Sequence, residues 1–178
     1  MRTLLFITLL IATSMQAQTI FKFSTNAQLN NWYVVNDGVM GGRSMGSIKQ
    51  NQQGYGVFAG SISLENNGGF SSVRYRLAEP MNIEGVTKVV LKIKADGKNY
   101  QFRLTDQIRN RYSYITTFST NGVWQEIVIP LNSFTPSFRG RPLNLPNFNA
   151  DILEEITFLI ANKKAEDFEL LIDSITLK

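Results

Sequence analysis

The sequence contains no histidine and no cysteine. Without histidine there is no imidazole general base, which excludes a Ser-His-Asp triad and a histidine-ligated metal. Without cysteine there is no thiol nucleophile, no disulfide, no zinc–thiolate site and no iron–sulfur cluster. Any catalysis would therefore have to use carboxylates, lysine, tyrosine or serine, or a hard cation bound through oxygen.

Charge is also scarce, since only 18% of the 178 residues are charged and the net charge is +4. The basic residues are interleaved with acids, and no block of five or six of them exists, so we predict no nucleic-acid partner. Aromatic residues make up 11% of the chain, which is typical of a globular protein. The length is that of one domain with one sizeable core.

The chain has only one apolar run near its start, from Leu4 to Ile11 after Arg2, and small residues follow it up to Ala17. This pattern predicts a secretory signal peptide over residues 1–17, although a buried N-terminal strand or helix is an alternative. The run is too short for a transmembrane span. We therefore expect an exported protein, periplasmic or extracellular, with one β-sandwich domain over residues 18–178. Without disulfides, its core alone must stabilise it.

Strand signals recur along the chain, and helix signals are rare. Eight segments alternate apolar and polar residues: Gly56–Glu65, Phe70–Leu77, Lys88–Lys94, Tyr100–Thr105, Tyr112–Ser119, Trp124–Ile129, Glu155–Ile160 and Phe168–Leu177. Turn-forming pairs separate them, including Asp96-Gly97, Asn121-Gly122 and Arg139-Gly140. The pattern predicts an all-β fold, an antiparallel β-sandwich or jelly roll. In the last segment the apolar phase switches at Asp173-Ser174, which predicts a bulge or bend.

Two other stretches carry weaker signals. We predict a short helical turn over Thr25–Trp32, with Thr25 or Asn26 as its cap. The longest irregular stretch, Pro130–Ala150, is expected either to be functional or to wrap an edge of the sandwich.

The first candidate site is the loop from Asp37 to Ser44. Its Gly41-Gly42 pair permits unusual backbone angles, and its amides could form an anion nest. The loop lacks the Lys-Ser/Thr ending of a P-loop. Three interpretations stay open: a structural turn, a phosphate site, and a ligand or partner surface.

The second candidate site runs from Leu64 to Arg74. Alternation places Arg74 on the same strand face as Ser72 and Arg76, and Arg103 would join them if its strand were adjacent. A guanidinium on a sheet face can bind a carboxylate, a phosphate or sugar hydroxyls, but the face can equally be solvated or salt-bridged. The predicted binding residues of the two sites are Asp37, Arg43, Ser44, Glu65, Asn66, Asn67, Phe70, Ser72 and Arg74.

Other chemistries remain as alternatives. The turn oxygens of Asp37, Glu65, Asn66, Asp96 and Asp173 could hold a structural calcium, but ordinary turn capping explains them too. Paired carboxylates could support a hydrolase, although Glu154-Glu155 are sequence neighbours that we expect to be solvated. Trp124, Phe118, Phe134, Phe138 and Phe148 could stack on sugars, but we expect them in the core.

Several of these motifs resemble the complex I intermediate-associated protein (thirty-kilodalton) family. The resemblance rests on Trp32, Asp37–Ser44, Phe58-Ala59-Gly60, Glu65–Arg74, Ala95-Asp96-Gly97 before Tyr100, Trp124 leading to Ile129-Pro130, Phe134-Thr135-Pro136 with Arg139-Gly140, and Phe168–Asp173. It runs from about Ile20 to Lys178 and implies a galactose-binding-like β-sandwich. The family's mitochondrial members assist assembly of respiratory complex I. Some plant relatives join this domain to a dehydrogenase-like domain and act in chloroplast gene expression.

The resemblance carries no established catalytic residue to this chain. We therefore predict a non-catalytic binding or assembly-factor-like module of the cell envelope, with no cofactor and no metal. Its expected partner is a protein. The alternatives are a carbohydrate-binding module and a hydrolase that uses Asp37 or Glu65.

Overall fold

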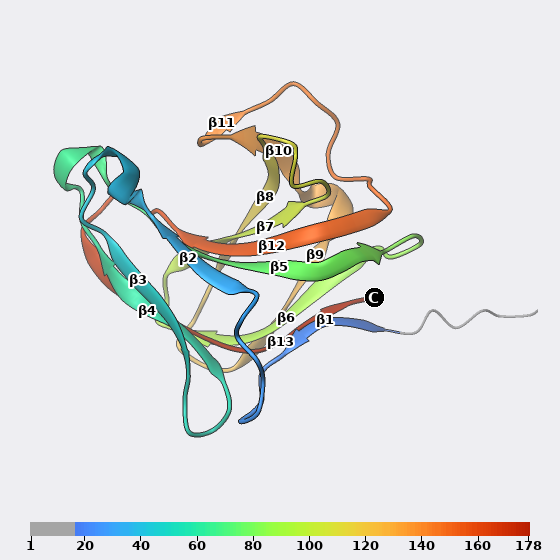
Figure 1. The fold of residues 1–178 in the computed structure, drawn as a ribbon, viewed down its shortest axis with the longest axis horizontal. Helices are drawn as coiled ribbons and strands as arrows, with labels where there is room; N and C mark the ends of the chain where they lie inside the picture. The colour runs from blue at the N-terminus through green and yellow to red at the C-terminus, as the bar shows by residue number, and fades with distance from the viewer. Residues whose placement is uncertain (1–16) are drawn as a thin grey trace, which may run out of the picture.

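The computed structural model describes residues 17–178, apart from the side chains of residues 39 and 40. The predicted signal peptide lies outside the described residues except for Ala17. The described chain folds into two antiparallel sheets that pack face to face (Figure 1). The predicted all-β sandwich is confirmed.

The first sheet has six strands in the order β3-β4-β13-β6-β9, and β1 pairs with β13 beside this path. The bounds are β1 Gln18–Lys22, β3 Met45–Gln50, β4 Gly56–Ile62, β6 Lys88–Ala95, β9 Gln125–Pro130 and β13 Glu166–Leu177. Between Ile172 and Ser174 the pairing of β13 with β6 shifts register. This shift is the bulge predicted from the switch in apolar phase.

The second sheet has seven strands in the order β11-β10-β8-β7-β12-β5-β2. The bounds are β2 Trp32–Asn36, β5 Ser71–Asn82, β7 Asn99–Thr105, β8 Ser113–Ser119, β10 Thr135–Phe138, β11 Arg141–Pro142 and β12 Ile152–Ile160. In Figure 1 the edge strands β10 and β11 lie at the top, away from β1, β6 and β13 of the six-stranded sheet.

The core lies between the sheets and is built by strand alternation. Phe58 of β4, Phe102 of β7 and Phe158 of β12 are each fully buried. The Phe102 and Phe158 rings lie 4.9 Å apart, centroid to centroid. Because alternate residues of a strand point to opposite faces, the residues next to these core positions along β5, β7 and β12 face outward.

All eight predicted segments are strands, and the turn-forming pairs lie between them. Gly97, Gly122 and Gly140 take positive φ angles of 82°, 83° and 76°. The helical turn predicted over Thr25–Trp32 is wrong: Thr25 and Asn26 form a turn, and Trp32 opens strand β2. The buried indole of Trp32 packs on the rings of Phe21, Phe23 and Tyr75, so tertiary packing outweighs the local helix signal.

The stretch Pro130–Ala150 is not irregular throughout. It contains a 3₁₀ turn over Leu131–Ser133, followed by β10 and β11. These two strands form the edge of the seven-stranded sheet, as the edge-wrapping interpretation predicted. Two further 3₁₀ turns, Asp37–Met40 and Glu65–Asn67, lie in the two candidate loops.

Candidate functional site

The side chain of Asp37 ties the two candidate loops together. Its carboxylate accepts hydrogen bonds from the backbone N–H groups of Ser44 at 3.1 Å, Gly69 at 2.6 Å and Phe70 at 3.3 Å, and from the Ser44 hydroxyl. Asp37 is buried. Burial by itself would raise the pKa of the carboxyl, but these hydrogen bonds hold the pKa below its usual value. We call Asp37, Ser44 and the Gly69–Phe70 amides the loop clasp.

Three further contacts join the same loops. Asn66 donates from Nδ2 to the Gly41 carbonyl at 2.8 Å. Arg43 and Glu65 form an ion pair at 2.8 Å, and both side chains are more than half exposed. Asn66 and Asn67 take left-handed backbone angles, with φ of 54° and 58°.

Close packing at the clasp explains the glycines of the motif. A Cβ on Gly42 would lie 2.3 Å from Oδ1 of Asp37, and one on Gly68 would lie 2.7 Å from Oδ2. The clasp therefore holds the loops with bonds made inside the protein. A ligand at Asp37 would have to replace these bonds, so the predicted binding role of Asp37 and Ser44 stays a prediction.

A second cluster of polar residues lies on the outer face of the seven-stranded sheet. Across β2, β5, β12 and β7 the outward-facing residues are Tyr33, Val35, Ser72, Arg74, Arg76, Gln101, Arg103, Thr105, Glu155, Thr157 and Leu159. We call this set the arginine face. It carries three guanidinium groups and one carboxylate.

The single carboxylate, Glu155, is buried and serves two of the three arginines. Its Oε1 lies 3.7 Å from Arg74 and its Oε2 lies 3.3 Å from Arg76. The Tyr33 hydroxyl also donates to Oε2 at 2.5 Å. Burial, together with this contact to Glu155, raises the pKa of the Tyr33 hydroxyl. Both carboxylate oxygens of Glu155 are thus engaged by residues of β2 and β5, namely Tyr33, Arg74 and Arg76.

Arg103 differs from the other two arginines because its hydrogen-bond partner among residues 17–178 is neutral. Its Nε and one terminal nitrogen donate to Oε1 of Gln101 at 3.1 and 2.7 Å. Among residues 17–178 no carboxylate lies within 4 Å of it. Burial of the guanidinium, with Arg74 nearby as a second cause, lowers the pKa of Arg103 to about 10. Within the described chain, Nε of Arg74 is also buried and has no hydrogen-bond partner.

The structure brings some of the predicted residues together and separates others. Arg74 lies on the arginine face, and Ser72 lies beside it, buried, with its hydroxyl donating to the Val35 carbonyl at 2.9 Å. Phe70 precedes the strand and belongs to the loop clasp. Arg103 does join Arg74, one strand removed rather than adjacent, because β12 lies between β5 and β7.

Sequence reasoning missed the role of Glu155, which we expected to be solvated. That expectation is wrong, because a register shift between Leu153 and Glu155 turns the side chain onto the arginine face. Tyr33 and Gln101 were missed as well. The alternating Gln101–Arg103 pattern of β7 was a usable signal, but strand order was needed to place it.

The aromatic residues fall mostly in the core, as expected. Phe118, Phe134 and Phe148 are buried. The expectation is wrong for two residues: Phe138 is half-buried, with the Arg139 guanidinium 5.3 Å from its ring centroid, and Trp124 has 37% of its surface exposed. The ring centroid of Trp124 lies 4.5 Å from that of Tyr55.

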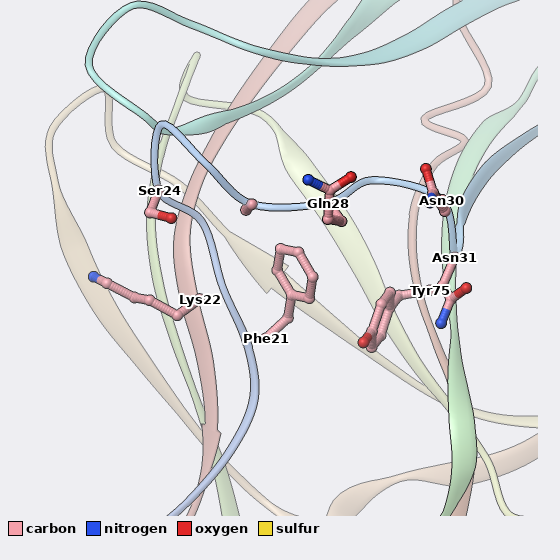
Figure 2. A pocket seen from close by; sticks show the side chains of 8 residues that line it. Phe21, Lys22, Ser24, Gln28, Asn30, Asn31 and Tyr75 are labelled. Carbon is pink, nitrogen blue, oxygen red and sulfur yellow. The ribbon is translucent and has the colours of Figure 1, made fainter.

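A hollow of about 470 Å³ lies between the β1–β2 connection and β5. Figure 2 shows the rings of Phe21 and Tyr75 pointing into it, with the amides of Gln28, Asn30 and Asn31 around them. The two rings meet edge to face at 4.9 Å, so much of their surface is used in packing. The one cation in its lining, Lys22, is bound to Asp173 at 2.6 Å.

A second hollow, of about 610 Å³, lies at the far end of β12 and includes Asp106, Asp151, Glu154 and Arg109. In residues 17–178, including this hollow, no group of three or more acidic side chains is placed so that it could hold a metal ion. Asp96 is bound to Lys98 and Tyr100, and Asp173 to Lys22 and Ser174. No helix in this part of the chain is long and apolar enough to cross a membrane.

Solved structures of carbohydrate-binding modules have the same two-sheet fold. A family 11 carbohydrate-binding module from a cellulosomal cellulase of Clostridium thermocellum superposes with a TM-score of 0.68 at 17% identity, over 93% of this chain and 95% of that one. A family 11 module from Clostridium thermocellum solved with a β-1,3-1,4-mixed-linked tetrasaccharide gives the same TM-score at 18% identity, over 93% and 96% of the two chains. At this identity the likeness shows the fold.

Sequence comparison gives the family. The model of the complex I intermediate-associated protein 30 (CIA30) family matches residues 21–172, and the chain belongs to this family. The mitochondrial complex I intermediate-associated protein 30 of Mus musculus is 24% identical over 90% of this chain and 56% of its own length. A probable mitochondrial relative from Caenorhabditis briggsae is also 24% identical, over 90% and 54%. The chain thus spans about half the length of the curated relatives it matches.

Proposed function

We propose that this protein is an exported, non-catalytic binding module, assembly-factor-like in its family relationship, and that the arginine face is its ligand surface. One observation carries the proposal. Arg74 and Arg103 are partly buried on an outer sheet face, and residues 17–178 supply neither enough carboxylates nor enough hydrogen-bond acceptors for them. Desolvating a cation without a counter-charge is costly, so such a group is expected where a ligand completes it.

Export is supported by the apolar run and small residues of positions 1–17. The non-catalytic role is supported by the missing histidine and cysteine and by the engagement of Asp37 and Glu155 in internal contacts. A general base needs a free position at the substrate, which neither carboxylate offers.

The test is capture from cell-envelope extracts with immobilised wild-type protein and the Arg74→Ala and Arg103→Ala variants. Lys94→Ala is the matched control, because Lys94 is an exposed cation on the other sheet. We expect the same partners with wild type and control and their loss with both arginine variants. Equal recovery of the same partners with all four proteins would exclude the arginine face as the binding surface.

A saccharide is the second candidate ligand, and the composition of the face favours it. Tyr33 offers a half-buried hydroxyl and Gln101 a half-buried amide, whereas Thr105 and Thr157 are buried. The large exposed apolar side chains of residues 17–178 all lie elsewhere. The fold is also that of modules solved with sugars. A glycan array with wild type, Arg103→Ala and Trp124→Ala would show whether a glycan binds, and whether the face or the exposed tryptophan holds it.

A further inference from the structure

The arginine face has more cationic charge than its own acid can balance. Glu155 lies against Arg74 and Arg76, and two guanidinium charges to one carboxylate leave a surplus on that side alone. Arg103 adds a third charge with only an amide oxygen beside it. The surplus is partly buried, so bulk water and salt screen it less than they would screen an exposed lysine.

The two least satisfied guanidinium groups lie in one row. Thr157 of β12 is the register partner of Arg74 on one side and of Arg103 on the other. A group placed over Thr157 would therefore have an arginine on either side. Arginine presents several N–H donors in a planar fork that matches a carboxylate, so this row offers donors rather than acceptors.

We propose that the arginine face binds an acidic saccharide, a sugar chain with carboxylate groups, and that Arg74 and Arg103 hold one carboxylate over Thr157. This inference rests on the proposed ligand surface and names its ligand class. Tyr33, which continues the row beside Arg74, and Gln101 in the next row are half-buried and supply polar groups for neighbouring hydroxyls.

An acidic peptide would satisfy the same charge, but the surroundings favour a sugar. Protein interfaces are typically centred on large apolar or aromatic anchors. Of the apolar and aromatic members of the arginine face, Leu159 is buried, Val35 is half-buried, and Tyr33 is half-buried with its hydroxyl bound to Glu155, so none is an exposed anchor. A face of hydroxyl, amide and guanidinium groups suits a ligand that is itself covered with hydroxyls.

The test is isothermal titration of the purified protein with three probes: a hexagalacturonate, a neutral mixed-linked β-glucan oligosaccharide and a hexaglutamate peptide. The proteins are wild type, Arg74→Gln, Arg103→Gln, Arg103→Lys and the control Lys94→Gln, each checked for folding by circular dichroism. Arg103→Lys keeps the positive charge but lacks the planar set of guanidinium N–H donors. It therefore still tests the inference if Arg103→Gln fails to fold.

We expect hexagalacturonate to bind wild type and Lys94→Gln alike, and to bind both glutamine variants at least about tenfold more weakly. The affinity should fall with added salt, and Arg103→Lys should be intermediate. Equal hexagalacturonate binding by Arg103→Gln and wild type would overturn the inference. So would preference for the neutral glucan or for hexaglutamate, or no binding of any probe. In those cases the envelope-capture experiment decides separately whether the arginine face is a ligand surface at all.

Discussion

Arg74 and Arg103 lie opposite the same residue, Thr157, on the two sides of strand β12, and the one carboxylate of their sheet face does not reach Arg103. Within a folded protein such a cation normally pairs with an acid. The relationship gives the arginine face its surplus charge and distinguishes it from the lysines of the other sheet, which are exposed to water.

Replacing Arg103 should stabilise the free protein. Arg103→Gln removes a partly buried charge that has no acid partner, and we expect a gain of about 1 kcal/mol, or about 2–4 °C in Tm. Thermal unfolding followed by circular dichroism measures it, with Lys94→Gln as the charge-matched control. A lower Tm for Arg103→Gln would show that the guanidinium is structural, against a ligand role.

Replacing Glu155 should have the opposite effect on stability. Glu155→Gln keeps the shape but leaves Arg74 and Arg76 without their acid, so we expect a loss of about 1–3 kcal/mol. The affinity for hexagalacturonate should rise, because a competing carboxylate is gone. Urea unfolding and titration measure the two effects. Glu126→Gln, an exposed acid on the six-stranded sheet, is the control and should change neither.

The loop clasp should contribute strongly to stability. Asp37→Asn replaces an acceptor with a group that faces the Gly69 N–H as a second donor, and should cost about 2–3 kcal/mol in urea unfolding. The exposed Arg43–Glu65 pair joins the same loops but should cost no more than about 0.5 kcal/mol in Arg43→Ala. Equal losses in the two variants would mean that Asp37 is not the residue that holds the loops.

The contribution of Asp37 should depend on pH. Because the folded state lowers the pKa of its carboxyl, the unfolded state binds the proton more readily, and the contribution is complete above the ordinary value near 4. It is lost as the pH falls through the lower folded pKa. The difference in unfolding free energy between wild type and Asp37→Asn should therefore be constant from pH 5 to 7 and shrink below about pH 4. A difference that persists unchanged to pH 2 would contradict the assignment.

Gly60 should tolerate no side chain. A Cβ there would lie 1.8 Å from the carbonyl oxygen of Met45 on the neighbouring strand, so Gly60→Ala should cost about 3 kcal/mol or more. Gly38→Ala is the control, because a Cβ there meets nothing within 4 Å. If the two variants were equally stable in urea, the close approach of β3 and β4 would be wrong.

The strands could be predicted because alternation is a local property of the sequence. The outward direction of Arg74 and the bulge at Asp173 follow from the same pattern. Which residues form the arginine face could not be predicted, because this depends on the order of the strands in the sheet. Strand β12 lies between β5 and β7, and this order places Arg74 and Arg103 in one row. The environment of Glu155 depends in addition on a register shift that the pattern does not show.

The short strands β1, β2, β3, β10 and β11 also escaped prediction. Glycine or proline interrupts the alternation in β3, β10 and β11, while β1 and β2 have only five residues each without a clear alternation. The two loop motifs lie side by side in the structure, and their binding role stays a prediction. Their glycines and Asp37 are explained by contacts between the loops that no local pattern could reveal.

The most direct test of the arginine face is a titration of ¹⁵N-labelled protein with hexagalacturonate, observing the arginine Nε–H resonances by NMR. We predict saturable shifts of the Arg74 and Arg103 resonances, with no comparable shift for Arg43 in the loops. Shifts confined to Arg43 and the backbone amides of residues 41–44 and 65–70, or unchanged Arg74 and Arg103 resonances while the probe binds, would contradict it.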